Sequence, residues 1–338
     1  MIETVLTAFG IDALSARTEE FGSGLINNTW KIAVGENSFI LQRINTAVFH
    51  HPEDIAYNIQ LIGDYLQLHH PDYFFVRPLP AKSGEVLVKT PDGYFRLMPF
   101  VRNSHTIDTV GEPSLAYEAA RQFGRFSRLV GGVDSKRVRV TIPGFHDLSL
   151  RFTQFQEAVK KAHPDRVREA REWITEAQQG EEIVAQFARL KKDPRFRMRI
   201  MHHDTKISNV LFDVENRGLC VIDLDTVMPG YFISDLGDMM RTYLSPVSEE
   251  EADLNKILVR KEIFDAIVEG YGEEMGSELT VLEKSLFTFA GQFMIYMQAL
   301  RFLADFLLGD IYYGAKYPGH NLVRAKNQLT LLSRLEAI

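Results

Sequence analysis

The chain has 338 residues, of which 45% are hydrophobic and 25% are charged, and its formal net charge is −7. This length allows a large core and two lobes, and the composition is not that of a disordered chain. The negative charge argues against a general nucleic-acid binder, and the single cysteine, Cys220, excludes an internal disulfide framework.

The first hundred residues predict a strand-rich unit. A Gly-rich turn at residues 21–28 precedes two apolar runs of the length of strands, and apolar residues then recur at helical spacing between Glu53 and Leu68. The predicted strands are Thr29–Val34, Ser38–Ile44, Phe74–Val76, Val86–Val88 and Tyr94–Met98, and the predicted helix is Glu53–Leu68.

From Pro113 onward the pattern is mainly helical. The change of pattern near Pro99–Val101 divides the chain into an N-terminal lobe, residues 1–100, and a C-terminal lobe, residues 101–338. The predicted helices of the second lobe are Leu115–Val130, Leu148–Gln179, Glu181–Lys192, Asp235–Tyr243, Glu249–Glu269, Val281–Leu308 and Val323–Leu335.

Two segments bear on location. Residues 1–10 contain Glu3 and lack the basic start and long apolar core of a signal peptide. The most apolar region, Leu286–Leu308, is interrupted by polar and charged side chains, so it is not a membrane span. We expect a cytoplasmic protein with no membrane or nucleic-acid partner, and the oligomeric state stays open.

One polar stretch within the second lobe carries the chemistry. Asp204, Lys206 and Asn209 follow His202 closely, and two apolar runs, 210–212 and 219–222, then predict a hairpin that ends at Asp223. The hairpin would bring Asn209 and Asp223 together although they are far apart in sequence. Carboxylate and amide oxygens are ligands that Mg²⁺ accepts, with phosphates and waters completing its shell. The pattern therefore predicts Asn209 and Asp223 as metal ligands.

The same stretch predicts phosphoryl transfer. That reaction needs a carboxylate that orients the acceptor hydroxyl and takes its proton, and groups that hold metal ions on the nucleotide phosphates. Protein kinases carry them in the order His, Asp and Asn, followed by a further Asp beyond a short hairpin. We assign the first role to Asp204, and the ammonium group of Lys206 would offset charge on the transferred group.

These motifs resemble those of the aminoglycoside phosphotransferase and choline kinase superfamily, and the resemblance covers nearly the whole chain. The chain looks most similar to the N-acetylhexosamine 1-kinase group within it. The segments behind the closer match are Phe21–Thr29, Leu41–Asn45, Ile222–Gly230 and Arg301–Tyr312. The resemblance implies a protein-kinase-like α+β fold, with a small antiparallel-sheet lobe and a large, mainly helical lobe. It also implies ATP and Mg²⁺ as cofactors. Asp235 would stabilise the 202–209 loop by accepting hydrogen bonds from the backbone of that loop.

The resemblance implies a nucleotide site made by the N-terminal lobe. Gly22, Ser23 and Gly24 would let the backbone approach phosphates, and Pro99, Phe100 and Val101 would bind adenine through the backbone. The chain departs from the superfamily at three kinds of position. Gln42, with Arg43 beside it, stands where a phosphate-binding Lys is usual, and only one of the two should face the nucleotide because neighbouring strand residues face opposite sides. Asn58 stands where the partner Glu of that Lys is usual, and the Gly-rich turn carries Leu25 and Asn27.

Three further residues are candidates for the acceptor site. Three roles stay open for Asp225: it could join the metal shell, contact the sugar, or serve the structure only. Arg301 and Tyr312 lie in a segment that lines the acceptor pocket of the sugar 1-kinases, where a guanidinium donates to sugar oxygens and an aromatic ring covers a sugar face. Core packing is the alternative for both, because the apolar residues around Arg301 form a buried stripe.

We therefore expect an ATP-dependent small-molecule kinase whose acceptor is the anomeric hydroxyl of an N-acetylhexosamine, giving a sugar 1-phosphate. One alternative is a kinase of the same superfamily that acts on an aminoglycoside, choline or another alcohol. A second is a nucleotide-binding regulator with little turnover, which Gln42 and Asn58 keep open.

Overall fold

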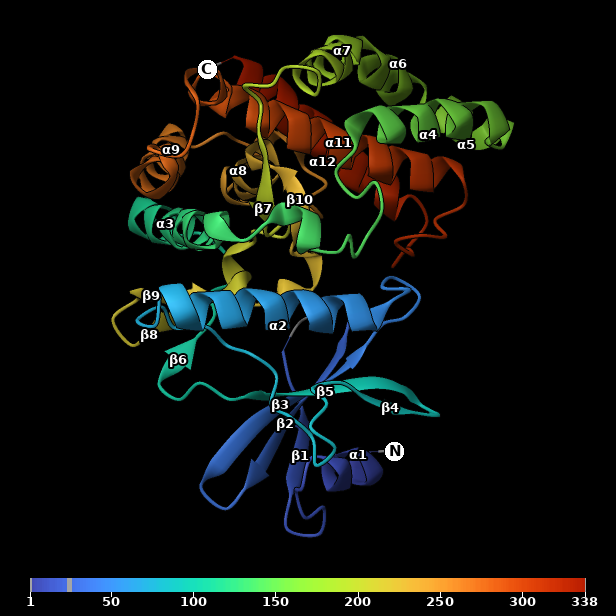
Figure 1. Ribbon diagram of the computed structural model, residues 1–338. Coiled ribbons are helices and arrows are strands. Elements are labelled where there is room, and N and C mark those ends of the chain that lie inside the picture. The colour runs from blue at the N-terminus through green and yellow to red at the C-terminus, as the bar shows by residue number, and fades with distance from the viewer. Residues whose placement is uncertain (1, 23–25, 338) are drawn as a thin grey trace.

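The structure is a computed structural model that describes residues 2–22 and 26–337 (Figure 1). Its N-terminal part is an antiparallel sheet with the strand order β1-β2-β3-β5-β4. Figure 1 shows this sheet at one end of the molecule and most of the helices at the other. The strands are β1 (Arg17–Glu20), β2 (Asn28–Val34), β3 (Asn37–Ile44), β4 (Val88–Thr90) and β5 (Gly93–Pro99).

The two faces of the sheet have different neighbours. Leu41 of β3 and Phe95 and Leu97 of β5 are buried in a small apolar core with Val5 and Leu6 of helix α1 (Ile2–Ala8). Because side chains alternate along a strand, Gln42 and Arg96 lie on the opposite face, which the rest of the chain covers.

Helix α2 (Pro52–His69) lies across the junction between the sheet and the helical part (Figure 1). Asn58 of this helix is fully buried. Its amide nitrogen donates to the carbonyl oxygens of Arg139 and Val227, at 2.8 and 3.1 Å, and its oxygen accepts from the Arg139 N–H at 2.8 Å. Asn58 therefore fixes α2 to the larger part of the chain, which is a structural role.

The larger part is a helical assembly with two small sheets. α11 forms its centre and is buried along most of its length. The helices are α3 (Pro113–Leu129), α4 (Leu148–Lys161), α5 (Pro164–Glu169), α6 (Arg171–Gln179), α7 (Glu181–Leu190), α8 (Phe232–Tyr243), α9 (Lys261–Met275), α10 (Val281–Lys284), α11 (Phe287–Leu307) and α12 (His320–Glu336). The strands are β6 (Ser104–His105), β7 (Met198–Met201), β8 (Val210–Asp213), β9 (Gly218–Val221) and β10 (Met228–Tyr231), with β7 paired to β10 and β8 paired to β6 and β9.

The α+β architecture with a sheet part and a helical part confirms the predicted fold class. Within the described residues, none of the helices has the length and apolar character needed to cross a bilayer. Most of the apolar region Leu286–Leu308 lies in α11 and is buried.

Several predicted elements were wrong in their bounds. The predicted helix 148–179 is three helices, because Pro164 has no N–H to continue α4 and instead begins α5 after the capping side chain of His163. The predicted helix 249–269 begins only at Lys261, and 281–308 is interrupted between α10 and α11. Phe74–Val76 forms no strand, and β4 begins at Val88, the last residue of the strand predicted at Val86–Val88.

Candidate active site

The 202–209 loop follows strand β7, and carboxylates of helix α8 hold it in place by hydrogen bonds to its backbone. The carboxylate of Asp235, which is fully buried, accepts hydrogen bonds from the backbone N–H of His202 at 3.0 Å and of His203 at 2.8 Å. His203 has a left-handed backbone, with φ of 67°, which these bonds help to fix. The structure thus bears out the expected contact of Asp235 with the loop backbone.

A second carboxylate of α8 holds the middle of the loop. Asp238 accepts from the Thr205 N–H at 2.8 Å and from Arg241 Nε at 2.9 Å, and the Tyr243 hydroxyl donates to the Thr205 carbonyl at 2.6 Å. Burial raises the pKa of Asp238, and the positive charge of Arg241 acts against that effect. Sequence reasoning did not identify Asp238 or Arg241, although both lie one or two helical turns after Asp235.

Asp204 and Lys206 point toward each other at the exposed edge of this loop. Lys206 Nζ lies 3.2 Å from Asp204 Oδ2, and the two side chains are 45% and 20% exposed. The negative charge of Asp204 raises the pKa of Lys206, which keeps the ammonium group charged. The structure thus places a cation beside a partly exposed carboxylate, and the catalytic roles of the two residues stay predictions.

The β8–β9 hairpin brings Asn209 and Asp223 to the same end. Val210 pairs with Val221, and the Ile222 N–H donates to the Asn209 carbonyl at 2.8 Å. The Asn209 amide nitrogen donates to the Asp204 carbonyl at 2.8 Å, which leaves its side-chain oxygen for another partner. Asp223 follows in a left-handed conformation, with φ of 60°. The hairpin thus places Asn209 and Asp223 at the same end, and the Asn209 side chain contacts the Asp204 backbone.

The donor set at this position fits a hard divalent cation. Asp223 is exposed, unlike most of its neighbours. The surrounding protein, and then the like charges of Asp225 and Asp204, raise the pKa of Asp223 to about 7. Solvent moderates the first cause at an exposed carboxylate, so we give the neighbouring charges the greater weight. A cation would relieve this repulsion.

Protein groups alone do not make a complete metal shell here. In residues 2–22 and 26–337, no three His, Cys, Asp or Glu side chains gather closely enough to hold an ion by themselves. Asn209 and Asp223 would supply two oxygen ligands, and phosphates and waters would supply the rest, as is usual for Mg²⁺.

Asp225 is buried beneath this site, and its partners come from the N-terminal sheet. Arg96 Nη1 of β5 forms an ion pair with Asp225 Oδ1, and the two side chains are 4% and 2% exposed. Asn27 Nδ2 donates to the other oxygen of Asp225 at 2.8 Å. Asp225 therefore ties the end of the Gly-rich turn and strand β5 to the helical part. Sequence reasoning missed Arg96, whose signal was a charge inside the apolar run 94–98.

The structure places the other predicted nucleotide residues as follows. Gly22 has a φ of 82°, which favours glycine, whereas Ser23 and Gly24 lie outside the described residues, as does Leu25. Gln42 faces Arg96, whose Nε donates to Gln42 Oε1 at 2.9 Å. Arg43 lies on the other face of β3, where its guanidinium is close to Gly93. Of this pair, only Gln42 therefore lies on the face of the sheet that carries Arg96.

The segment Pro99–Val101 begins at the last residue of strand β5. The ring of Phe100 meets that of Phe21 edge to face at 6.0 Å, so the segment contacts the start of the Gly-rich turn. The Phe100 N–H donates to the Ser38 carbonyl at 3.2 Å. The Val101 N–H has no partner among the described residues, which leaves it for a ligand.

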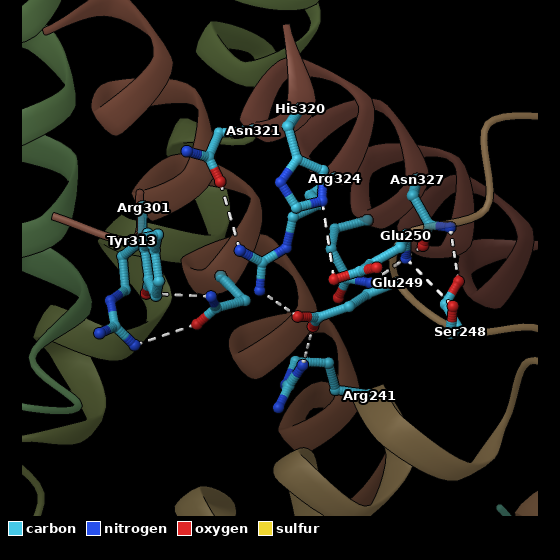
Figure 2. Close-up of polar contacts among 12 residues, drawn as sticks. Arg241, Ser248, Glu249, Glu250, Arg301, Tyr313, His320, Asn321, Arg324 and Asn327 are labelled. Carbon is cyan, nitrogen blue, oxygen red and sulfur yellow. Dashed lines mark hydrogen bonds and ion pairs between the residues drawn. The ribbon is translucent and has the colours of Figure 1, made fainter. Parts of the chain in front are cut away.

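Arg301 and Tyr312 lie together near the end of α11. The guanidinium carbon of Arg301 is 5.9 Å from the ring centre of Tyr312 and 5.4 Å from that of Tyr313. Arg301 Nη1 donates to Gln298 Oε1 at 3.0 Å, and the Gln298 amide donates to the Tyr313 hydroxyl at 3.1 Å (Figure 2). Tyr312 is 66% exposed. The structure brings the two predicted acceptor residues together and leaves Tyr312 open to solvent, whereas Arg301 is partly buried.

His146 connects this cluster to the 202–209 loop. Its Nδ1 lies 3.2 Å from Nδ1 of His203, the residue before Asp204. Burial, and then the charges of His203 and Arg301, lower the pKa of His146 well below its usual value, so the ring is neutral. Arg151 belongs to the same surroundings, because the charge of Arg301 also lowers its pKa after the effect of burial.

The charges in this region are unequally matched. Figure 2 shows Glu249 between Arg241 and Arg324, and Lys316 binds Glu250 at 2.8 Å. Asp305 accepts from the backbone N–H groups of Tyr312 and Tyr313, and Asp310 pairs with Arg166 at 2.6 Å. By contrast, Arg151 and Arg301 form no ion pair with a carboxylate of the described residues. The charge left for a ligand is therefore positive.

The chain is similar to a known family and to several solved structures. The model of the phosphotransferase enzyme family matches residues 17–265. The structure is similar to that of a spectinomycin phosphotransferase in complex with ADP and spectinomycin, with 14% identity, a TM-score of 0.60, and coverage of 100% of this chain and 98% of that chain.

Two further structures have the same fold. An aminoglycoside phosphotransferase from Alicyclobacillus acidocaldarius is 12% identical, with a TM-score of 0.63 and coverage of 99% of this chain and 95% of that chain. A choline kinase from Streptococcus pneumoniae is 12% identical, with a TM-score of 0.58 and coverage of 98% of this chain and 97% of that chain. The wider superfamily that the sequence resembles is thus supported, and the N-acetylhexosamine 1-kinase subgroup stays a prediction.

Proposed function

The chain belongs to the phosphotransferase enzyme family, and from that membership we propose that it transfers the γ-phosphoryl group of ATP to a hydroxyl group of a small molecule. The observation that carries the proposal is the convergence of Asp204, Asn209 and Asp223 at one end of the β8–β9 hairpin. Phosphoryl transfer depends mostly on positioning and on electrostatic stabilisation, and this arrangement supplies groups for both.

Each residue of the loop has a distinct task in this proposal. Asp204 orients the acceptor hydroxyl and takes its proton, and the partly exposed carboxylate is accessible for that purpose. Lys206, which is charged and 3.2 Å from Asp204, stabilises negative charge on the transferred group. Asn209 and Asp223 hold Mg²⁺, which would neutralise charge on the phosphates.

The nucleotide is held by the N-terminal sheet. The similarity to a spectinomycin phosphotransferase in complex with ADP supports an adenine nucleotide. The left-handed Gly22 lets the Gly-rich turn approach phosphates, and the Val101 N–H donates to adenine. Asn58 does not weaken this proposal, because it is buried in structural hydrogen bonds away from the nucleotide.

The acceptor that the cluster around Arg301 fits is an uncharged, oxygen-rich molecule. Arg301 is a free donor for sugar hydroxyl or acetamido oxygens, and the exposed ring of Tyr312 offers a face to a pyranose. A polycation would meet Arg151 and Arg301 without a compensating carboxylate, which disfavours an aminoglycoside. We therefore propose an N-acetylhexosamine, phosphorylated at its anomeric hydroxyl.

A second candidate is an amino-alcohol kinase. The observation in its favour is the group of aromatic rings at the same place, Phe145, Tyr312 and Tyr313, because such rings bind cations. In the structure these rings surround Arg301, so an ammonium ligand would have to displace that guanidinium.

The acceptor is identified by measuring ADP release with ATP, Mg²⁺ and a panel of alcohols. We expect N-acetylglucosamine or N-acetylgalactosamine to stimulate release, and their 1-O-methyl glycosides, which lack a free anomeric hydroxyl, to be inactive. Stimulation by choline, ethanolamine or spectinomycin alone would favour the second candidate. Equal stimulation by a sugar and its methyl glycoside would refute the anomeric position.

A further inference from the structure

Arg96 is a buried cation at the junction of the two parts of the chain. It lies on β5, an interior strand of the sheet, where its neighbours Phe95 and Leu97 point into the small core on the other face. Its own side chain, 4% exposed, points toward the helical part and pairs with Asp225. A buried charge needs partners, because removing it from water costs free energy that ion pairs and hydrogen bonds must offset.

The position of Arg96 relates directly to a gap in the nucleotide site. Phosphoryl transfer of the kinase type uses a cation on the third strand to bind the nucleotide phosphates, held by a carboxylate from elsewhere in the protein. Here that strand carries the neutral Gln42. In the register of the sheet, Gln42 is the direct partner of Arg96, and the two side chains share one face. The positive charge therefore lies on the neighbouring strand β5 instead of on β3.

The guanidinium of Arg96 keeps donors for a ligand. Of its five N–H groups, Nε donates to Gln42 at 2.9 Å and one hydrogen of Nη1 is directed at Asp225. Nη2 has no hydrogen-bond partner among the described residues. Guanidinium groups bind phosphate oxygens with two parallel hydrogen bonds, so Nη2 and the second hydrogen of Nη1 are suited to that geometry.

The neighbours of Arg96 are the groups that a nucleotide would meet. Asp225 lies two residues after the proposed metal ligand Asp223 and also accepts a hydrogen bond from Asn27 of the Gly-rich turn. Little water screens a cation at this exposure, so its attraction for phosphate is strong.

We propose that Arg96 binds the phosphates of the nucleotide in place of a lysine on β3, and that Asp225 and Gln42 position its guanidinium. The inference rests on the proposed kinase function and deepens it. It also gives Asp225 a defined role, because this carboxylate holds the phosphate-binding cation as well as the end of the Gly-rich turn.

The experiment separates phosphate recognition from adenine recognition. The dissociation constants of ADP and adenosine are measured by calorimetry for the full chain and for variants, and their ratio is the readout. Arg96→Met alone would leave Asp225 as a buried, unpaired charge, so the test variant is R96M/D225N, which removes both charges. The matched control is Lys89→Met, which removes an exposed cation of strand β4 in the same sheet. D225N is measured beside it, because it removes the positioning carboxylate and leaves Arg96 in place.

We expect R96M/D225N to lose about tenfold to a hundredfold in affinity for ADP and little in affinity for adenosine, because a charge-assisted phosphate contact is lost. Lys89→Met should keep the ADP preference of the unaltered protein, and D225N, which removes only the carboxylate that positions Arg96, should lose less of it than R96M/D225N. An unchanged ratio in R96M/D225N would overturn the inference and leave the kinase function standing. Failure of the unaltered protein to bind ADP would overturn both.

A further variant keeps the test decisive should R96M/D225N not fold. Arg96→Lys retains a positive charge opposite Asp225 but has no planar fork for two parallel bonds. We expect its ADP preference to fall by about threefold to tenfold. An unchanged preference in this variant, with a melting temperature like that of the unaltered protein, would also overturn the inference.

Discussion

Replacing Asp204 by Asn separates chemistry from folding more cleanly than any other change at the site. Asn has the same shape, and the only contact that the Asp204 carboxylate makes among the described residues is the ion pair with Lys206. Exposed pairs of this kind contribute about 0–1 kcal/mol. The hydrogen bond from Asn209 is to the backbone oxygen of Asp204, so it survives the change. The free energy of unfolding should therefore fall by less than about 1 kcal/mol.

The effect on turnover should be much larger. General base catalysis contributes roughly 10²–10⁴ in rate, which corresponds to about 3–5 kcal/mol of the activation barrier. We expect kcat of Asp204→Asn to fall by about a hundredfold or more. The affinity for ATP and Mg²⁺ should be kept or improved, because the negative charge of Asp204 is one of the causes that raise the pKa of Asp223.

The assay is steady-state turnover of the purified variant, with calorimetric ATP binding and a thermal melt beside it. Asp265→Asn is the matched control, since Asp265 also pairs with a lysine, Lys261 at 2.6 Å, but on the exposed surface of α9. A loss of turnover below about threefold would refute the assignment of Asp204. So would a large loss accompanied by an equal loss of ATP affinity and a lowered melting temperature, because the role would then be structural.

Further predictions concern the metal, the acceptor and the loop. Asp223→Ala should abolish the Mg²⁺ dependence of ATP binding in calorimetry while the apo melting temperature changes little, and wild-type metal dependence would exclude Asp223 as a ligand. Because the pKa of Asp223 is about 7 and a cation binds only its deprotonated form, affinity for Mg²⁺-ATP should rise as pH increases through 7, and a flat profile between pH 6 and 8 would contradict this. Arg301→Ala should lower kcat/KM for the acceptor by roughly tenfold to a hundredfold without changing the KM for ATP, whereas equal damage to both substrates with a lower melting temperature would indicate core packing. Asp235→Ala should lower the free energy of unfolding in urea by about 2–6 kcal/mol, because two buried backbone N–H groups lose their acceptor, while Ser127→Ala, whose bond to Asp235 is 3.5 Å long, should cost less than about 1 kcal/mol.

The predicted site residues that the structure brings together are those placed by local structure. Asn209 and Asp223 flank a short hairpin, so the pairing of Val210 with Val221 brings them together without help from the rest of the fold. Asp204 and Lys206 lie in the same short loop, and their proximity also follows from sequence separation alone.

Arg96 could not be placed from sequence in the same way. Its partners are Gln42, 54 residues away, and Asp225, 129 residues away, and neither contact leaves a local pattern. Which face of β5 it occupies depends on strand register, and a shift of one residue would reverse it. The role of Asn58 was equally hidden, because its acceptors are backbone carbonyls of distant segments.

Helix bounds failed where a short-range signal competed with apolar periodicity. Pro164 ended a helix that the surrounding pattern would have continued. Thr280 and Glu283 form a capping box that starts the short helix α10, and the chain then turns before α11 begins. In both places the backbone hydrogen bonds, and not the apolar pattern, decided the structure.

The central claim, transfer of phosphoryl from ATP to a small-molecule hydroxyl, is tested most directly by phosphorus NMR of a reaction that contains the protein, ATP, Mg²⁺ and an N-acetylhexosamine. The account predicts that the γ-phosphate signal of ATP is replaced by a phosphomonoester signal coupled to the anomeric proton of the sugar, and that Asp204→Asn slows this change by about a hundredfold or more. A spectrum in which ATP persists, or yields only inorganic phosphate at the same rate with every acceptor and in both proteins, would contradict it.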